Sequence, residues 1–330
     1  MNKIILWNGT TSHRSQWSIF FLHPAELSLV IHAMWVALYD RWAYYPKISY
    51  ETVVDSFYNI IDEKENCRAS LNSKIVKINL SEDKTKVVSV ETKKWEIIEW
   101  DNFIFNWDPK MSMDLIWKEF FSEQFRKKLD YKYSLWALTI FLWIEWYDIE
   151  KYLWEENVFY YSHVSINSIY EECFKDGIPE KLHFFLNSPS VRVPDLLTPK
   201  GCHQVVAIAP CNYDYFEKLK SEDIEKYKEA KQQYSDKIIE VINEKFLPWF
   251  KDNIIEKVVG SPTTSERFVN VPKGNCYGRS LDLEHLHSKL NWKSPFSNFH
   301  YIWASSSFPW FAPLIGKAAK LYEEFTWDKI

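Results

Sequence analysis

The stretch SPFSNFHYIWASSSFPWFAPLIGKAA, residues 294–319, contains the pattern that decides the fold. An apolar segment leads into a Ser-rich loop, and an apolar helical pattern follows that loop. This order predicts a strand, a loop and a helix, an arrangement whose loop approaches a cofactor closely, usually through glycine. Trp303 and Trp310 instead bracket the loop. The stretch therefore predicts a cofactor-binding turn with tryptophan in two glycine places.

The same exchange is visible in the composition of the whole chain. The 330 residues include 17 Trp and only 7 Gly. An average protein contains about 7% Gly, which would be roughly 23 residues at this length. The two counts together equal 24, close to that expected glycine total. The composition therefore indicates that tryptophan has replaced glycine.

Individual tryptophans stand where the backbone favours glycine. Trp95 lies between two strand patterns, where a hairpin needs a positive φ, and Trp154 follows a short helical segment as a C′ glycine does. We interpret such tryptophans as UGA codons that mean glycine, a hypothesis that UGG codons at all 17 positions would reject. Trp17 and Trp249 could be either residue. The alternative is a genuinely aromatic-rich protein with tryptophan in its core.

Periodicity predicts the elements that precede this stretch. Helical spacing of apolar residues predicts helices over 24–39 and 51–62. Short β patterns then predict a meander and a return strand at 73–80, 86–92, 96–100 and 102–106. Further strands are predicted at 138–144, 181–187 and 203–210. The longest helix is predicted to begin after an N-cap at Ser221 and to stop before Pro248.

Charge and cysteine content exclude several classes of protein. The net charge of -5 arises from 40 basic and 45 acidic residues without a polybasic stripe, so no nucleic-acid partner is expected. No apolar run reaches the ~18 residues that span a bilayer, and the N-terminus lacks a secretory apolar region. A cytoplasmic, soluble or membrane-peripheral protein is expected. The five cysteines form no CxxC pair, and His285 and His287 have the wrong helical spacing for a metal site, so no metal is expected.

Motifs along the chain resemble the phytoene desaturase, carotenoid isomerase and retinol saturase group of the flavin amine oxidase superfamily. The resemblance covers nearly the whole chain, and the closing stretch, residues 294–319, is its most specific part. The other motifs are PAELSLVIHAMWVALYDRWAYYPK (24–47, Trp42 in a glycine place), NSKIVKI (72–78), DNFIFNWDP (101–109), LIWKEFFSEQFRKKL (115–129, with Trp117), SLWALTIFLWIE (134–145, with Trp143) and SPTTSERFVNVPKGNCYGRS (261–280). The first motif departs from the family pattern, which has paired glycines where Ile48 and Ser49 stand.

The resemblance implies a mixed α/β fold with an incomplete FAD-binding Rossmann-like domain, a β-meander, and a substrate domain with a mixed or antiparallel sheet. Implied segments are substrate-domain helices at 1–45, the remainder of the FAD-binding domain at 46–110, the substrate domain at 111–292, and the closing FAD-binding strand, loop and helix at 293–330. Implied FAD contacts are Ile75, Trp303, Ala304, Ser305, Trp310, Phe311, Ala312 and Pro313. Candidates for the substrate pocket are Tyr44, Tyr45, Arg267 and Tyr277.

The implied activity is hydride transfer between the flavin of FAD and a long apolar polyene, or flavin-dependent isomerisation of one. The family's GxGxxG unit, which holds the FAD pyrophosphate, has no match here, so a separately encoded Rossmann segment is an expected partner. No catalytic residue is assigned. Two alternatives stay open: a non-catalytic protein that stacks ligands on exposed Trp and Tyr, and a pseudoenzyme fragment.

Overall fold

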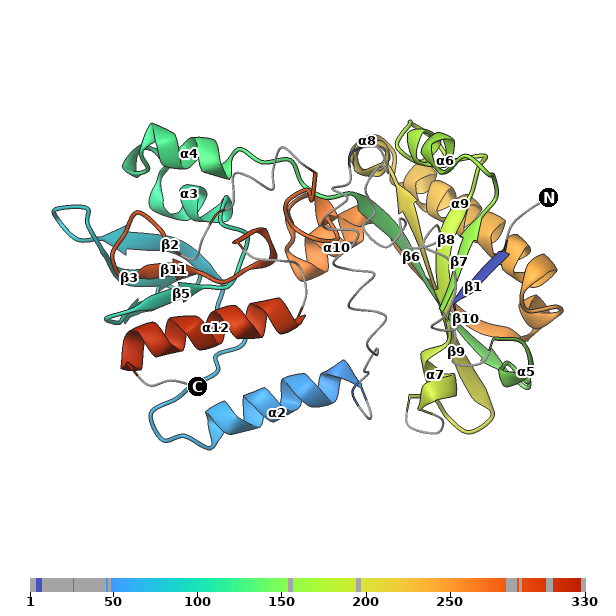
Figure 1. Ribbon diagram of the computed structural model, residues 1–330, viewed down its shortest axis with the longest axis horizontal. Helices are drawn as coiled ribbons and strands as arrows, with labels where there is room; N and C mark the ends of the chain where they lie inside the picture. The colour runs from blue at the N-terminus through green and yellow to red at the C-terminus, as the bar shows by residue number, and fades with distance from the viewer. Residues whose placement is uncertain are drawn as a thin grey trace. The chain divides into compact units, whose positions relative to one another are not determined.

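The computed structural model describes residues 4–7, 26, 46, 49–153, 157–193, 197–282, 290, 293–306 and 311–327. The chain divides into two compact units, whose helices and strands are labelled in Figure 1. Unit 1 comprises Met1–Ile60 and Leu135–Cys276, and unit 2 comprises Ile61–Ser134 and Tyr277–Ile330. Both units combine helices with sheets, which confirms the mixed α/β class. The assignment of FAD-binding and substrate roles to segments of the chain stays a prediction.

Unit 1 is built on a six-stranded sheet in the order β1-β7-β8-β9-β6-β10, in which every neighbouring pair is antiparallel. The antiparallel sheet expected from the sequence is thereby confirmed. Its strands are β1 (Ile4–Trp7), β6 (Trp136–Glu145), β7 (Asn157–Tyr161), β8 (His183–Asn187), β9 (Cys202–Cys211) and β10 (Ile254–Gly260). Its helices include α5 (Glu150–Leu153), α6 (Ile166–Cys173), α7 (Pro189–Arg192), α8 (Tyr213–Glu222), α9 (Ile224–Lys245), η3 (Phe250–Asn253), α10 (Pro262–Val269) and η4 (Pro272–Gly274).

Both faces of the unit 1 sheet are covered. Val158 and Tyr160 of β7 pack into the large core that contains α8 and α9, whereas Phe159 and Tyr161 pack with α6 in a second cluster. This division follows from the alternation of side chains along a strand. A strand buried on both faces needs apolar residues at consecutive positions, which explains the run NVFYY.

The predicted N-cap of the longest helix was wrong by two residues. Ser221 lies inside α8, where its hydroxyl donates to the carbonyl of Lys218. Asp223 is the N-cap of α9, and its carboxylate accepts hydrogen bonds from the amides of Glu225 and Lys226 at 3.1 and 3.2 Å. An ionised Asp satisfies the exposed amides and also favours the positive end of the helix dipole.

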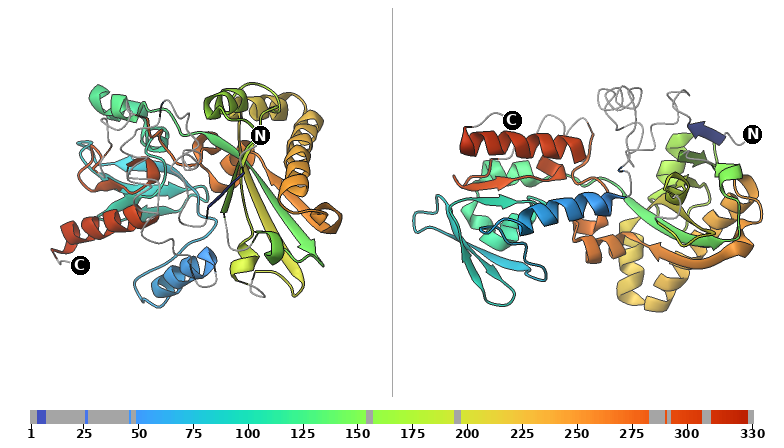
Figure 2. Two further views of the ribbon diagram at one scale, coloured as in Figure 1. Left: turned by 45° about the vertical axis from the view of Figure 1, so that its right-hand side comes forward. Right: turned by 90° about the horizontal axis from the view of Figure 1, so that it is seen from below.

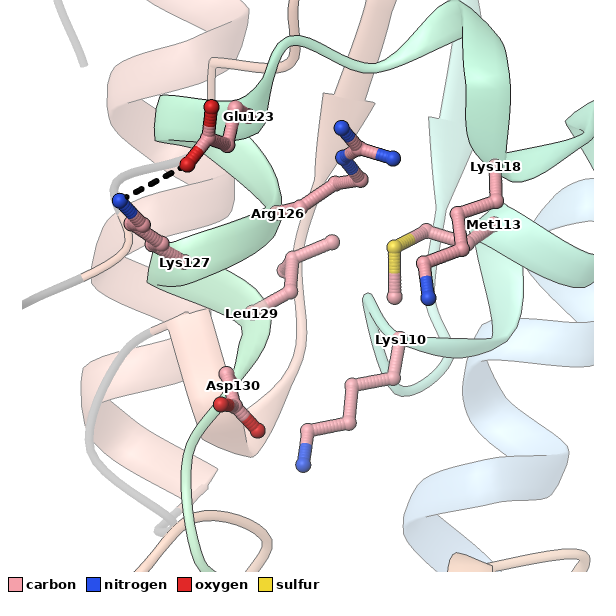
Figure 3. Close-up of a pocket in the computed structure, with 8 residues that line it drawn as sticks. All are labelled: Lys110, Met113, Lys118, Glu123, Arg126, Lys127, Leu129 and Asp130. Atoms are coloured by element: carbon pink, nitrogen blue, oxygen red, sulfur yellow. Dashed lines mark ion pairs between the residues drawn. The ribbon is translucent and has the colours of Figure 1, made fainter.

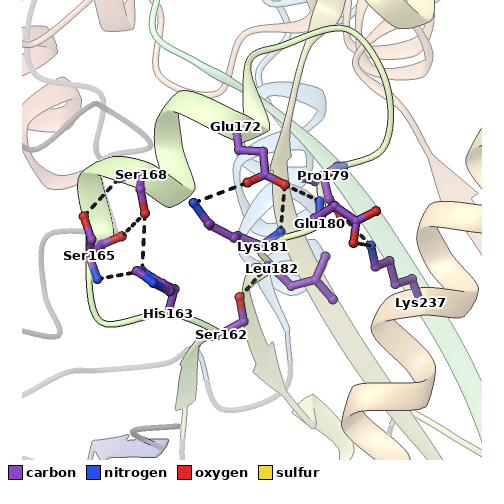
Figure 4. A network of polar contacts seen from close by, with 10 residues as sticks. All are labelled: Ser162, His163, Ser165, Ser168, Glu172, Pro179, Glu180, Lys181, Leu182 and Lys237. Carbon is purple, nitrogen blue, oxygen red and sulfur yellow. Dashed lines mark hydrogen bonds and ion pairs between the residues drawn. The ribbon is translucent and has the colours of Figure 1, made fainter. Parts of the chain in front are cut away.

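A polar network joins α6 to the segment that precedes β8 (Figure 4). The Glu172 carboxylate accepts hydrogen bonds from the amides of Glu180 and Lys181, and the Lys181 ammonium lies 3.7 Å from it. Although desolvation raises the pKa of this carboxyl, the two backbone hydrogen bonds outweigh it and leave the pKa below the usual value.

Unit 2 contains the predicted β-meander, an antiparallel sheet in the order β2-β3-β4. A separate parallel pair joins β5 to β11, with Phe103 opposite Phe299. Figures 1 and 2 show α12 running beside this pair, and the rings of His300 and Phe325 lie 5.1 Å apart. The elements are β2 (Ile75–Leu80), β3 (Val87–Thr92), β4 (Ile97–Glu99), β5 (Phe103–Phe105), α3 (Met111–Ile116), η2 (Lys118–Phe120), α4 (Glu123–Leu129), β11 (Phe299–Tyr301), η5 (Ala304–Ser306) and α12 (Phe311–Thr326).

Helix α2 (Tyr50–Asp62), predicted at residues 51–62, has no buried residue. Val54 and Phe57 are 65% and 53% exposed. The helix predicted over 24–39 lies outside the described residues.

Backbone angles bear on the interpretation that tryptophans stand in place of glycines. Trp95 has a φ of 67° in the turn between β3 and β4, as the hairpin pattern predicted. Trp143 lies within β6, opposite Gln204, without a positive φ, and its interpretation as glycine stays a prediction. Trp17, Trp42, Trp154 and Trp310 lie outside the described residues.

Candidate functional site

The turn after β11 is fixed by reciprocal hydrogen bonds. The amide of Trp303 donates to the Ser306 hydroxyl, and the amide of Ser306 donates to the Trp303 carbonyl, each at 3.0 Å. Ser305 and Ser306 are 2% and 4% exposed. The closing motif therefore forms a tight, buried turn rather than a loose loop.

Asp108 anchors this turn from a distant part of the chain. Its carboxylate is fully buried and accepts a hydrogen bond from the Ser305 hydroxyl at 2.9 Å. The Lys110 amide donates to the other carboxylate oxygen at 3.0 Å. A buried carboxylate needs several such donors to replace its hydration.

Two tyrosines complete the hydrogen bonding of Asp108. The hydroxyls of Tyr131 and Tyr133 donate to Oδ1 at 2.9 and 3.3 Å. Burial, followed by the charge of Asp108, raises the pKa of both phenols well above the usual value. Both phenols therefore stay protonated and act as donors at neutral pH.

Gly278 and Arg279 approach the same turn. Gly278 has a φ of 75°, and a β-carbon added to it would lie 2.7 Å from the Ser305 hydroxyl and 3.1 Å from the Ala304 β-carbon. The Arg279 amide donates to the Ser305 hydroxyl at 3.1 Å. Burial lowers the pKa of the Arg279 guanidinium, which lies 5.7 Å from the Tyr131 ring. The Tyr-Gly motif of the sequence thus packs directly on the closing motif.

Helix α12 follows the turn and begins at Phe311. Lys317, 8% exposed, donates from its ammonium to the carbonyl of Ser306. The first turn of a helix presents free amides and partial positive charge. Unit 2 therefore contains the free amides of the first turn of α12 and the buried ammonium of Lys317 on the same helix.

The expected site residues are distributed over both units. In unit 2, Ile75 begins β2 opposite Thr92, and the half-buried Tyr277 donates its amide to the Ser134 hydroxyl at 2.8 Å. In unit 1, Arg267 is exposed on α10, with its guanidinium 5.2 Å from the Phe268 ring. Tyr44, Tyr45 and Trp310 lie outside the described residues, as do the side chains of Phe311 and Ala312.

Sequence reasoning missed the anchor of the turn. Asp108 belongs to the quoted NWDP motif, yet no role was assigned to it, and none was assigned to Tyr131, Tyr133 or Lys317. The alternation YKY at residues 131–133 places both tyrosines on one side of an extended segment, which could have indicated a shared acceptor.

No helix among the described residues has the length and apolar character needed to cross a membrane.

No protein-family profile matches the chain. A solved cyclohexylamine oxidase from Brevibacterium oxydans matches with a TM-score of 0.54 and 9% identity, over 95% of this chain and 64% of that one. The chain therefore shares the fold of that oxidase.

Curated relatives confirm the narrower resemblance found in the sequence. The chain is 26% identical over 288 residues to an all-trans-retinol 13,14-reductase from Danio rerio, covering 81% of this chain and 46% of the relative. It is 23% identical over 280 residues to a phytoene desaturase from Phycomyces blakesleeanus, covering 79% and 44%. The chain thus resembles the phytoene desaturase and retinol saturase group, whose members are oxidoreductases. It spans less than half the length of these curated relatives.

Proposed function

We propose that this chain is part of an FAD-dependent oxidoreductase that desaturates, saturates or isomerises a long apolar polyene. The observation that carries the proposal is the buried turn at residues 303–306, which contacts Asp108 and Gly278 and accepts a hydrogen bond from Lys317 of α12. Such a turn is preorganised, because the hydroxyls of Ser305 and Ser306 and the amides of Trp303 and Ser306 already have partners before any ligand binds.

The donor set of the turn suits the pyrimidine edge of a flavin. Backbone amides at the start of α12 would face that edge, where negative charge develops on reduction. Trp303, Ala304, Ser305, Trp310 and Phe311 to Pro313 are the proposed contacts, and Ile75 would contact the adenine end through its backbone. Bound FAD would supply the hydride chemistry, while the chain binds and orients it.

The substrate class is inferred from the relatives. One is named for retinol and the other for phytoene, which are both long apolar molecules. Tyr44, Tyr45, Arg267 and Tyr277 are the proposed pocket residues. Contact with a membrane surface would give access to such a substrate, because polyenes partition into lipid.

A nucleotide-binding segment is the proposed partner, either encoded separately or continuous with this chain. Among the described residues, β5 pairs only with β11, so its other edge has no strand. Parallel sheets occur almost only as larger sheets with both faces covered. The parallel strand of a GxGxxG unit would extend this sheet at β5.

Flavin retention tests this function. The chain is expressed with and without the upstream GxGxxG segment, and flavin absorbance is measured after gel filtration. We expect a yellow complex only with the segment, and a stronger one with Trp303→Gly, because the half-buried indole stands at the proposed contact. Ser305→Ala should weaken retention. A colourless complex with intact partners would contradict the proposal.

A further inference from the structure

An open cavity of about 410 Å³ lies between α3 and α4 in unit 2 (Figure 3). All of its lining comes from the segment between residues 110 and 130. Four cations line it, Lys110, Lys118, Arg126 and Lys127, together with two carboxylates. The cavity therefore has an excess of positive charge in a protein whose net charge is -5.

Two of the four cations already have partners. The Lys127 ammonium lies 2.9 Å from the carboxylate of Glu123, and both side chains are largely exposed. The Lys110 ammonium donates to the carbonyl of Tyr131 and lies 4.3 Å from the Tyr131 ring. Both ammonium groups therefore already have an acceptor.

The other two cations have no such partner. Within the described part of the chain, the side chains of Arg126 and Lys118 form no hydrogen bond or ion pair with any residue. Figure 3 shows both extending toward the space beside Met113. Arg126 is half-buried as a residue, and its guanidinium has no acceptor among the described residues. An oxyanion bound there would supply one.

We propose that this cavity binds a phosphate group, with Arg126 as a two-pronged donor and Lys118 as a second charge. The planar guanidinium matches two phosphate oxygens, and charge-assisted bonds of this kind are the strong ones. Met113 and the buried Leu129 provide apolar lining beside the charges. A phospholipid headgroup has both features, a phosphate and an adjoining apolar chain.

The inference that a phosphate group binds here does not depend on the proposed function. The inference that this phosphate belongs to a lipid rests on the apolar substrate of the proposed function. A headgroup bound here would hold unit 2 at the membrane surface in which such a substrate dissolves. Free phosphate could occupy the same donors, so the experiment must separate the two sources.

Co-sedimentation of the full chain with vesicles provides the test. We expect binding to phosphatidylcholine vesicles that contain phosphatidic acid and none to phosphatidylcholine alone. Arg126→Gln should weaken binding about tenfold and Lys118→Gln several-fold, because each removes a charge-assisted donor. Lys128→Gln is the matched control, since it removes one charge from the same helix outside the cavity lining, and it should change binding by less than about twofold.

Each other result is decisive. An equal loss with Lys128→Gln, at unchanged melting temperature, would show general surface attraction and overturn the site. Absence of binding to both vesicles and inorganic phosphate would overturn it as well. Binding of inorganic phosphate that Arg126→Gln abolishes, without vesicle binding, would keep the site and overturn the lipid source. None of these readouts involves flavin, so failure of the proposed function is measured separately.

A second inference comes from an independent observation, the backbone angles of tryptophan. Nine described residues other than glycine have a positive φ, and five of them are Trp. They are Trp95 (67°), Trp117 (79°), Trp146 (55°), Trp249 (67°) and Trp327 (62°). Trp95 lies in a turn, the other four directly flank a helix or strand, and all five are more than half exposed.

These positions are unfavourable for tryptophan. A left-handed conformation costs an L-residue about 1–2 kcal/mol relative to the right-handed one, and glycine avoids this cost. An exposed indole gains no burial in return. Trp117 and Trp327 directly follow α3 and α12, and the ends of helices commonly use glycine where φ is positive.

We infer that the polypeptide made in its source cell carries glycine at these five positions, because its gene is read with UGA as glycine. This extends the sequence interpretation to Trp146 and Trp327 and resolves Trp249. The gene should show UGA at all five codons, and peptides from the native protein should have glycine masses there. UGG codons at these positions, or tryptophan masses in native peptides, would overturn the inference.

Discussion

The Ser305 hydroxyl donates to the Asp108 carboxylate at 2.9 Å, although 197 positions separate the two residues in the chain. The bond joins the end of the meander segment to the closing turn. Both ends of it are buried, so neither group can exchange its partner for water.

Removal of the Asp108 carboxylate should strongly destabilise unit 2. Asp108→Ala leaves three hydroxyl donors and one amide without an acceptor, and we expect a loss of about 3 kcal/mol or more in the free energy of unfolding. Asp108→Asn keeps one acceptor oxygen and should lose less. Urea unfolding measures both, with Asp114→Ala as an exposed control on α3. Equal stabilities of Asp108→Ala and the control would contradict the anchoring role.

Gly278→Ala should cost more than an ordinary glycine replacement. Its β-carbon would meet Ser305 and Ala304 inside normal contact distance, in addition to adopting a φ of 75°. Gly201 provides the comparison, because its φ is 82° and nothing lies within 4 Å of an added β-carbon. We expect about 1 kcal/mol for Gly201→Ala and at least about 2 kcal/mol for Gly278→Ala. Similar losses of unfolding free energy for both variants would mean that the turn at residues 303–306 accommodates the added β-carbon.

Glycine should stabilise the chain at the left-handed tryptophans. We expect Trp95→Gly and Trp249→Gly each to raise the free energy of unfolding by roughly 0.5–1 kcal/mol, since the relief of a positive φ exceeds the entropic disadvantage of glycine. Trp100→Gly removes an indole that is 66% exposed but does not have a positive φ. It should give no gain. Thermal and urea unfolding of the three variants decide the matter.

Acid should weaken unit 1 through His183. Burial lowers the pKa of this imidazole from 6.5 to about 4, although the hydrogen bond to the Tyr160 carbonyl opposes the shift. The unfolded chain therefore binds the proton first, so stability is complete above the unfolded pKa and falls as the pH drops from 6.5 toward 4. The loss attributable to His183 should reach about 3 kcal/mol.

Comparison of variants isolates the contribution of His183 to the pH dependence of the unfolding free energy. His183→Gln should flatten the dependence of the unfolding free energy across that interval, whereas the exposed His163→Gln should leave it unchanged. A slope that is the same in all three proteins would assign the acid sensitivity to other groups.

Local patterns predicted much of the fold and only part of the site. The meander, the long antiparallel strands and the turn at Trp95 follow from alternation and turn chemistry, which act over a few residues. The N-cap was predicted at Ser221 but is Asp223, because α8 extends to Glu222. No change in the apolar periodicity marks the boundary between the two helices. The anchor at Asp108 could not be predicted, since its distant partners, Tyr131 and Ser305, come from two segments that only the folded chain brings next to it.

The pairing of β5 with β11 has a consequence for synthesis on the ribosome. Phe103 is made long before its partner Phe299, and the whole strand set β6 to β10 of unit 1 is translated between them. Nearly all of unit 1 can therefore form while unit 2 still lacks β11 and α12. The phenylalanines of β5, Phe103 and Phe105, lack their partner strand during that interval, which favours aggregation of the nascent chain until β11 and α12 have emerged.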